Sequence, residues 1–110
     1  MVIKKTTKKK AKEYVIDFLD YLEREKGLPI ESAYFFGSYV KGRPKNWSDI
    51  DIAVVSNKFG GGTDPYEYLW KNLRDIDVER GIEPVGFHPK TFVNEDPLVW
   101  EIKQHGVRVL

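Results

Sequence analysis

Two short runs decide the fold expected of this chain: Ala33-Tyr34-Phe35-Phe36-Gly37-Ser38 and, after a gap of ten residues, Asp49-Ile50-Asp51-Ile52-Ala53-Val54-Val55. The first run is apolar up to a Gly-Ser pair, which predicts a buried strand at about residues 32–36 that ends in a sharp turn. The second run opens with two carboxylates among β-branched residues and predicts a strand at about residues 49–56. This combination indicates a site for a metal ion and a nucleotide.

Asp49 and Asp51 have the spacing of a shared cation site. Alternate residues of a strand lie on one face, so their Cα atoms are expected about 6.5–7 Å apart. Mg²⁺ is usually held by one or two carboxylates together with water and substrate phosphates. Ile50, Ile52 and Val54 lie on the other face and are available for burial. The pair is therefore expected on a rigid, half-buried strand.

Gly37 and Ser38 suit a phosphate group. Glycine allows a sharp turn and a close approach of the backbone to a ligand. Backbone N–H groups at the start of a helical turn, together with a serine hydroxyl, donate to phosphate oxygens, and Lys41, Arg43 and Lys45 add positive charge. A Gly-Ser pair alone is common in loops, and Asp-x-Asp alone is usually a solvated strand edge. Their conjunction favours the functional interpretation.

Glu83 is the candidate for a third carboxylate. Asp64-Pro65 begins a helix predicted over residues 64–80, and a third strand follows from Ile82. A right-handed crossover would make this strand parallel to the strand at 49–56 and bring Glu83 beside the two aspartates. The alternative is an exposed glutamate on an edge strand, since Pro84 lacks an N–H and suits an edge or bulge.

Gly37-Ser38, the ten-residue gap and Asp49-Ile50-Asp51 resemble the signature of the DNA polymerase β-like nucleotidyltransferase superfamily. The chain length is similar to that of its smallest branch, the minimal nucleotidyltransferases often paired with HEPN proteins. The resemblance covers about residues 30–110. Family members often carry a basic residue after the serine, where this chain has Tyr39, whereas Lys41-Gly42 follows the usual pattern. The expected fold is α/β (α+β), with a small mixed sheet of about four strands and helices packed on one side.

The function expected from the site and the resemblance is the metal-dependent transfer of a nucleoside monophosphate, AMP from ATP or another triphosphate, to a hydroxyl. Asp49, Asp51 and Glu83 are the predicted catalytic and metal-binding residues, with two Mg²⁺ ions, or Mn²⁺, as cofactors. The predicted nucleotide-binding residues are Gly37, Ser38, Lys41 and Arg43. The resemblance implies that the acceptor is a tyrosine of a helical HEPN ribonuclease toxin, which makes this chain an antitoxin.

Two alternatives of other classes remain open. The first is a non-catalytic module that masks its partner and retains only vestigial metal and nucleotide binding. The second is a small metal-dependent nuclease, although a Gly-Ser turn serves a terminal triphosphate better than an internal phosphodiester. The sequence also leaves a homo-oligomer open.

Composition predicts one domain over residues 1–110, with residues 1–7 as a flexible basic N-terminus. A net charge of +1 does not favour a nucleic-acid partner. The absence of cysteine fits a reducing cytoplasm, and no apolar run approaches the ~20 residues of a membrane span, so a cytoplasmic protein with no membrane partner is expected.

The other expected elements are a helix over residues 8–26, a helix from 97 to about 105 and a closing strand at 107–110. Gly60-Gly61-Gly62 is interpreted as a mobile loop, with closure over the nucleotide as the less favoured role, and His88 as a surface residue. The role of Trp47 stays open between base stacking and core cover. The side chains predicted to face inward from the two later helices are Tyr66, Leu69, Trp70, Leu73, Ile76, Leu98, Val99 and Ile102.

Overall fold

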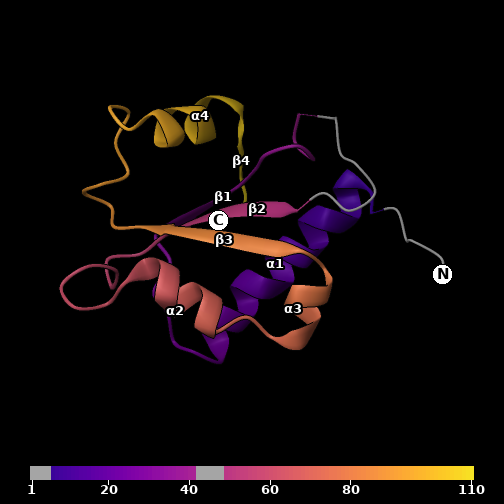
Figure 1. Cartoon of the computed structure of the whole chain (residues 1–110), viewed down its shortest axis with the longest axis horizontal. Coiled ribbons are helices and arrows are strands. Elements are labelled where there is room, and N and C mark those ends of the chain that lie inside the picture. Colours follow the sequence, from indigo (N-terminus) through magenta and orange to yellow (C-terminus); the bar gives the residue numbers. More distant parts are fainter. Residues whose placement is uncertain (1–5, 42–48) are drawn as a thin grey trace.

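The computed structural model of the chain describes residues 6–41 and 49–110. These residues form a mixed four-stranded sheet in the order β3-β2-β1-β4 with helices on both faces (Figure 1). None of the helices in these ranges is long and apolar enough to cross a membrane. Residues 1–5 of the predicted flexible N-terminus lie outside the described part. The elements are α1 (Lys8–Arg24), β1 (Ser32–Phe36), β2 (Ile50–Val55), α2 (Pro65–Lys71), α3 (Asp75–Glu79), β3 (Ile82–Phe87), α4 (Pro97–His105) and β4 (Val107–Arg108).

The sheet combines parallel and antiparallel pairs. β1 is antiparallel to both β2 and β4, whereas β2 and β3 are parallel and are joined through α2 and α3. The register places Asp51 opposite Glu83 and Val54 opposite Gly86. The predicted mixed α/β fold and the parallel pairing of the second and third strands are therefore confirmed.

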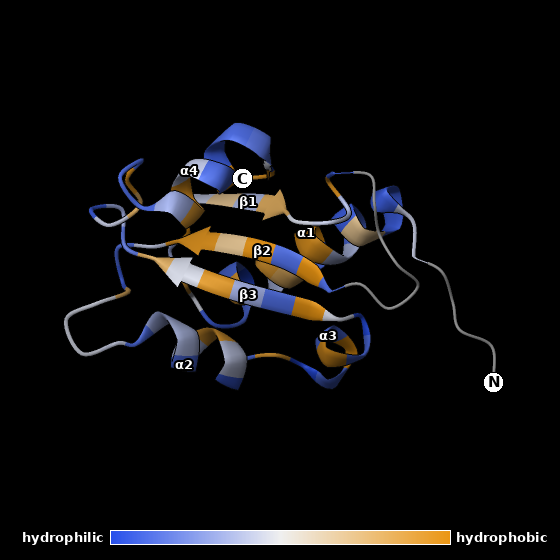
Figure 2. Cartoon of the chain, turned by 45° about the horizontal axis from the view of Figure 1, so that its top comes forward, coloured by the Kyte–Doolittle hydropathy of each residue, from blue (hydrophilic) through white to orange (hydrophobic). Residues whose placement is uncertain are grey.

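Both faces of β2 are buried, and a different helix covers each. Ile50, Ile52 and Val54 belong to the main core with the apolar residues of α1. Ala53 and Val55 face the other way and pack with Val99 and Ile102 of α4, and Figure 2 shows the resulting hydrophobic strands between the helices. The prediction that all helices lie on one side was wrong. Because β2 is apolar on both faces, each face needs a cover, and the stripe of α4 supplies the second.

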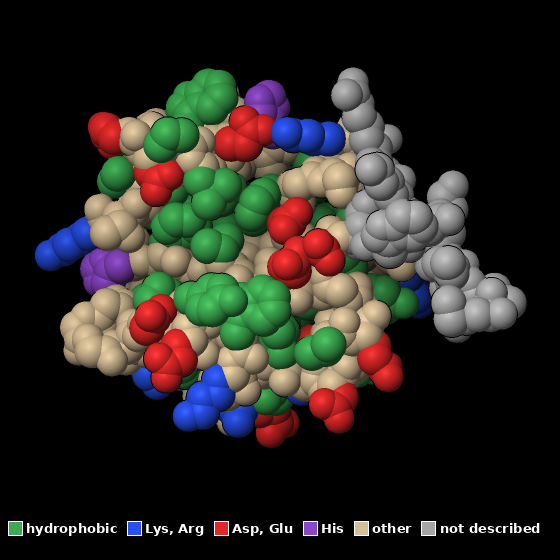
Figure 3. Space-filling view, viewed as in Figure 1, with side chains coloured by type: hydrophobic (Ala, Val, Ile, Leu, Met, Phe, Trp, Pro, Cys, Tyr) green, Lys and Arg blue, Asp and Glu red, His purple; other side chains and the backbone are tan. Residues whose placement is uncertain are grey.

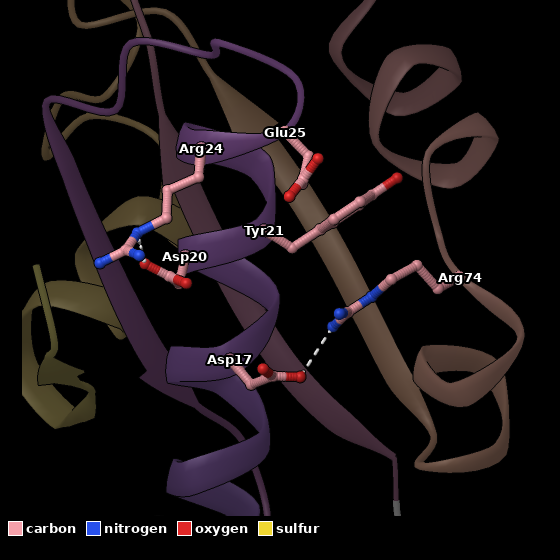
Figure 4. Close-up of a pocket in the computed structure, with 6 residues that line it drawn as sticks. All are labelled: Asp17, Asp20, Tyr21, Arg24, Glu25 and Arg74. Atoms are coloured by element: carbon pink, nitrogen blue, oxygen red, sulfur yellow. Dashed lines mark hydrogen bonds and ion pairs between the residues drawn. The ribbon is translucent and has the colours of Figure 1, made fainter.

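The helix predicted over 64–80 is divided into α2 and α3. Arg74 lies between them in an extended conformation (φ −78°, ψ 161°). Its backbone N–H and its guanidinium donate hydrogen bonds, each of 2.9 Å, to the buried carboxylate of Asp77. The same guanidinium donates to Asp17 of α1 at 2.8 Å, which ties α3 to α1 (Figure 4). Tyr66, in the first turn of α2, and Ile76, in α3 after the break, are both exposed, so their predicted burial was wrong.

Leu98 was also predicted to face inward and is exposed instead. It follows Pro97 in the first turn of α4, ahead of the buried pair Val99 and Ile102. α4 therefore buries a narrower stripe than the sequence suggested.

Trp70 protects the outer edge of the sheet. β3 is an edge strand, and edge strands expose backbone groups to which another chain can pair. Pro84 has no N–H, and its carbonyl accepts a hydrogen bond of 3.1 Å from the Trp70 indole. Trp70 is about one-third exposed and stacks on Tyr66. It therefore covers an edge, in contrast to the buried core position predicted for it.

Replacement of Gly86 by alanine is expected to destabilise the fold by about 1–3 kcal/mol, because a Cβ there would overlap the packing of α2 on β3. The added atom would lie 2.7 Å from Pro65 Cβ and 2.9 Å from Leu69 Cδ1. Urea unfolding followed by circular dichroism measures the change. Val78→Ala, at an exposed position of α3, is the control and is expected to shift the free energy of unfolding by less than about 0.5 kcal/mol. Equal stability of Gly86→Ala and the parent protein would contradict the packing described.

Candidate active site

The three predicted carboxylates come together at one end of the sheet. Because β2 and β3 are parallel, their N-terminal ends lie at the same edge, with Asp51 opposite Glu83 and Asp49 directly before β2. The Glu83 carboxyl is within hydrogen-bonding reach of Asp49. Figure 2 shows hydrophilic segments near the starts of β2 and β3, and Figure 3 shows acidic side chains gathered there. The crossover thus produces the acidic trio expected from the sequence.

The pKa values of Asp51 and Glu83 are both raised, so these two carboxyl groups are hard to ionise. Burial, and then the charge of Asp49, raise the pKa of Asp51 to about 6. The hydrogen bond with Asp49, together with burial and the charges of both aspartates, raises the pKa of Glu83 to about 7. Near neutral pH, and with no cation present, protonation of Glu83 relieves the repulsion.

Gly37 lies directly against this trio. Its backbone has φ +90°, and a Cβ at this position would overlap the Asp51 carboxylate. The antiparallel pairing of Phe36 with Asp51 brings the two segments together. The sequence predicted a glycine that lets the backbone approach a ligand, and the structure adds that this glycine makes room for the carboxylate itself.

The chain forms a single helical turn after Gly37. The N–H groups of Val40 and Lys41 both donate to the Gly37 carbonyl at 3.1 Å, and Ser38 lies in the first half of this turn. Tyr39 is 2% exposed and belongs to the core that α1 covers. The side chain of Tyr39, which replaces the usual basic residue of the family signature, is therefore part of the core and makes no side-chain contribution to the site.

The predicted basic residues are only partly described. The Lys41 ammonium forms an ion pair with Glu101 of α4 at 2.7 Å. Arg43, Lys45 and Trp47 lie outside the described residues, so the predictions made for them stay predictions. Sequence analysis missed Glu101, because a partner 60 positions away gives no local signal.

Two other features singled out in the sequence lie away from the trio. Gly60-Gly61-Gly62 follows the C-terminal end of β2, and His88 follows the C-terminal end of β3. The trio lies at the N-terminal ends of the same strands, so both features are at the opposite end of the sheet (Figure 1). The triple-glycine loop is not placed to close over the site.

Two cavities differ in where they lie relative to the trio. One, of about 190 Å³, adjoins the Gly37 turn and is lined by Phe36, Gly37, Lys41, Leu98, Glu101 and His105. The other, of about 410 Å³, is lined by Asp17, Asp20, Tyr21, Arg24, Glu25 and Arg74, and Figure 4 shows the Arg74–Asp17 ion pair across it. In the second cavity Arg74 pairs with Asp17 and Arg24 pairs with Asp20, and the lining residues come from α1, its C-cap and the α2–α3 connection.

The donor chemistry of the trio fits a hard divalent cation. Carboxylate oxygens are the protein ligands that Mg²⁺ and Mn²⁺ use, and a cation would relieve the repulsion that raises the pKa of Asp51 and Glu83. Within residues 6–41 and 49–110, however, no group of three His, Cys, Asp or Glu side chains has the spacing of a preformed metal site. The chemistry of the carboxylates thus suits a metal, but the described side chains are not arranged as a preformed metal site.

Comparison with known proteins identifies the family. The profile described as Polymerase beta, Nucleotidyltransferase matches residues 17–110. The chain belongs to this family. This confirms the superfamily expected from Gly37-Ser38 and Asp49-Ile50-Asp51, whereas its HEPN-paired branch stays a prediction. Members of the family commonly use divalent metal ions.

A solved structure shares the fold of this polymerase β-family chain. It is a Sulfolobus solfataricus protein provisionally assigned as a nucleotidyltransferase, with a TM-score of 0.63 and 16% sequence identity. The match covers 92% of this chain and 80% of the other. At this level of identity the likeness shows the fold alone. No curated protein sequence matched the chain.

The raised pKa values predict how stability depends on pH in metal-free buffer. The folded state holds protons on Asp51 and Glu83 that the unfolded chain releases from about pH 4, so these groups lower stability as pH rises from about 4 to 7. Glu83→Gln is therefore expected to gain stability relative to the parent protein as the pH rises through this window. Urea unfolding at several pH values measures the difference.

Glu23→Gln, at an exposed position of α1, is the control for this pH series and is expected to follow the parent curve. A constant difference between Glu83→Gln and the parent protein at all pH values would show that Glu83 is not coupled to the aspartates.

Proposed function

We propose that the chain is a metal-dependent nucleotidyltransferase that moves AMP from ATP to an acceptor hydroxyl. The convergence of Asp49, Asp51 and Glu83 beside the Gly37 turn is the observation that supports this activity most strongly. A protein that only masks a partner has no need to hold three repelling carboxylates together. Membership of the polymerase β family supports the same reaction class.

The turn at Gly37 would hold the triphosphate. N–H groups that open a helical turn have no acceptor within it, so those of Ser38 and Tyr39, together with the Ser38 hydroxyl, are suited to donate to the β- and γ-phosphate oxygens. Asp49, Asp51 and Glu83 would hold Mg²⁺, as two ions or with Mn²⁺ as the alternative. When bound, such ions neutralise charge on the triphosphate and make the attacking hydroxyl more acidic.

Glu83 is suited to receive the proton of the acceptor. It lies opposite Asp51 in the register of β2 and β3, beside the aspartates that would hold the ion that makes the hydroxyl more acidic. The hydroxyl oxygen would attack the α-phosphorus, the bond from this phosphorus to the bridging oxygen would break, and pyrophosphate would leave. The hydroxyl proton would pass to Glu83.

We propose further that a separate helical protein of the HEPN type supplies the hydroxyl from a tyrosine, so that the chain acts as an antitoxin. The resemblance of Gly37-Ser38 and Asp49-Ile50-Asp51 to the minimal nucleotidyltransferases supports this acceptor.

Incubation with Mg²⁺ and ATP, labelled in separate reactions on the α- or the γ-phosphate, tests the reaction class. Label from the α position alone is expected to appear in a macromolecule from the source lysate. Asp51→Asn should lower this transfer about 100-fold or more, because the metal and the triphosphate lose a ligand at the reacting phosphorus. Glu83→Gln should slow transfer and leave triphosphate binding nearly unchanged.

Glu23→Gln serves again as the matched control and should transfer label at the parent rate. Transfer of γ label would indicate a kinase. Equal transfer by Asp51→Asn and the parent protein would refute the assignment of Asp51. Absence of label in a lysate from which a partner nevertheless co-purifies would favour the masking function.

A further inference from the structure

We propose that Glu101 of α4 is a positioning residue that holds the Lys41 ammonium beside the Gly37 turn and competes with triphosphate oxygens for it. The inference rests on the proposed function, because it assigns Lys41 to the phosphate side of the site. It adds a residue that the family signature does not contain. If Glu101 has this role, triphosphate binds Lys41 by displacing the Glu101 carboxylate from it.

Geometry places the ion pair next to the turn. Lys41 is the last residue of that turn, and its N–H donates to the Gly37 carbonyl at 3.1 Å. Its ammonium lies 2.7 Å from Glu101 Oε1. Both side chains line the cavity of about 190 Å³ that Gly37 also lines, and Phe36 and Leu98 form its apolar part. Glu101 therefore keeps the ammonium in a cavity that reaches the phosphate turn.

The ion pair between Lys41 and Glu101 contributes little to the stability of the fold. The side chains of Lys41 and Glu101 are 53% and 38% exposed, and exposed ion pairs add little to the stability of a fold. α4 is already anchored by Val99 and Ile102, which are fully buried. A triphosphate carries several negative charges and a carboxylate only one, so the ligand can displace Glu101 without disturbing the core.

The surroundings of Glu101 favour its charged form. The hydrogen bond from Lys41 holds the pKa of Glu101 below its usual value, and the charge of His105 acts in the same direction. His105 lies one helical turn further along α4 and lines the same cavity. A released Glu101 carboxylate therefore remains next to a second basic side chain, which eases its exchange for phosphate.

The test measures the dissociation constants of inorganic tripolyphosphate and of ATP for four proteins: parent, Glu101→Gln, Lys41→Gln and the double variant. Glu101→Gln should bind both ligands about two- to fivefold more tightly at low salt, which is the range set by the loss of an exposed ion pair. Lys41→Gln should bind them more weakly. In the Lys41→Gln background, Glu101→Gln should have no further effect.

Glu95→Gln, at an exposed position just before α4, controls for the change in net charge and should bind like the parent protein. The gain shown by Glu101→Gln should shrink in high salt, because screening weakens the competing pair. Urea unfolding should show nearly equal stability for Glu101→Gln and the parent protein. A loss of stability in Glu101→Gln would instead indicate a purely structural role.

The two proposals fail in different ways. Unchanged or weaker tripolyphosphate binding by Glu101→Gln, an equal gain in the Lys41→Gln background, or no binding by any variant would overturn the role of Glu101. Transfer of α label by the parent protein would still uphold the proposed reaction in each case. Conversely, tighter tripolyphosphate binding by Glu101→Gln, with no transfer of label by any protein, would uphold the ion-pair exchange and reject the transferase.

Discussion

The parallel register of β3 against β2 is the constraint on which the site depends. It places Glu83 opposite Asp51, and a slip of one residue would turn Glu83 toward the face that α1 covers. Two features at other points of β3 fix this register. Ile82 is buried with the main core, and Gly86 lies so close to α2 that a Cβ there would meet Pro65 and Leu69. Packing at the far end of the strand therefore aligns the carboxylates.

The acidic trio lowers the stability of the free chain, and the core offsets this cost. Raised pKa values mean that ionisation of Asp51 and Glu83 is less favourable in the folded state than in the unfolded chain. α1 closes one face of the sheet, and Arg74 ties it to α3 by binding Asp17 and Asp77 together. The repulsion between the carboxylates is thus confined to one end of a sheet that is buried on both faces. A site of this kind gains most from a ligand that brings positive charge.

Sequence reasoning succeeded where the signal was local or followed from a rule of topology. The bounds of β1 followed from an apolar run that ends at Gly37, and the parallel position of Glu83 followed from the crossover rule. It failed where a distant partner decided the outcome. At the break between α2 and α3, Arg74 binds both Asp77 and Asp17. The packing of α4 on the second face of the sheet depends on the β2 residues that α1 does not cover. Lys41 and Glu101 also pair across a long stretch of sequence, so no local pattern could predict their contact.

The carboxylates lie on the face of the sheet that α4 covers only in part. α4 covers the far part of the same face through Val99 and Ile102, whereas Asp49 is exposed and Asp51 and Glu83 are half-buried. Hydrophobic side chains border the acidic cluster on the open face (Figure 3). This hydrophobic border suits contact with a macromolecule such as the partner proposed above.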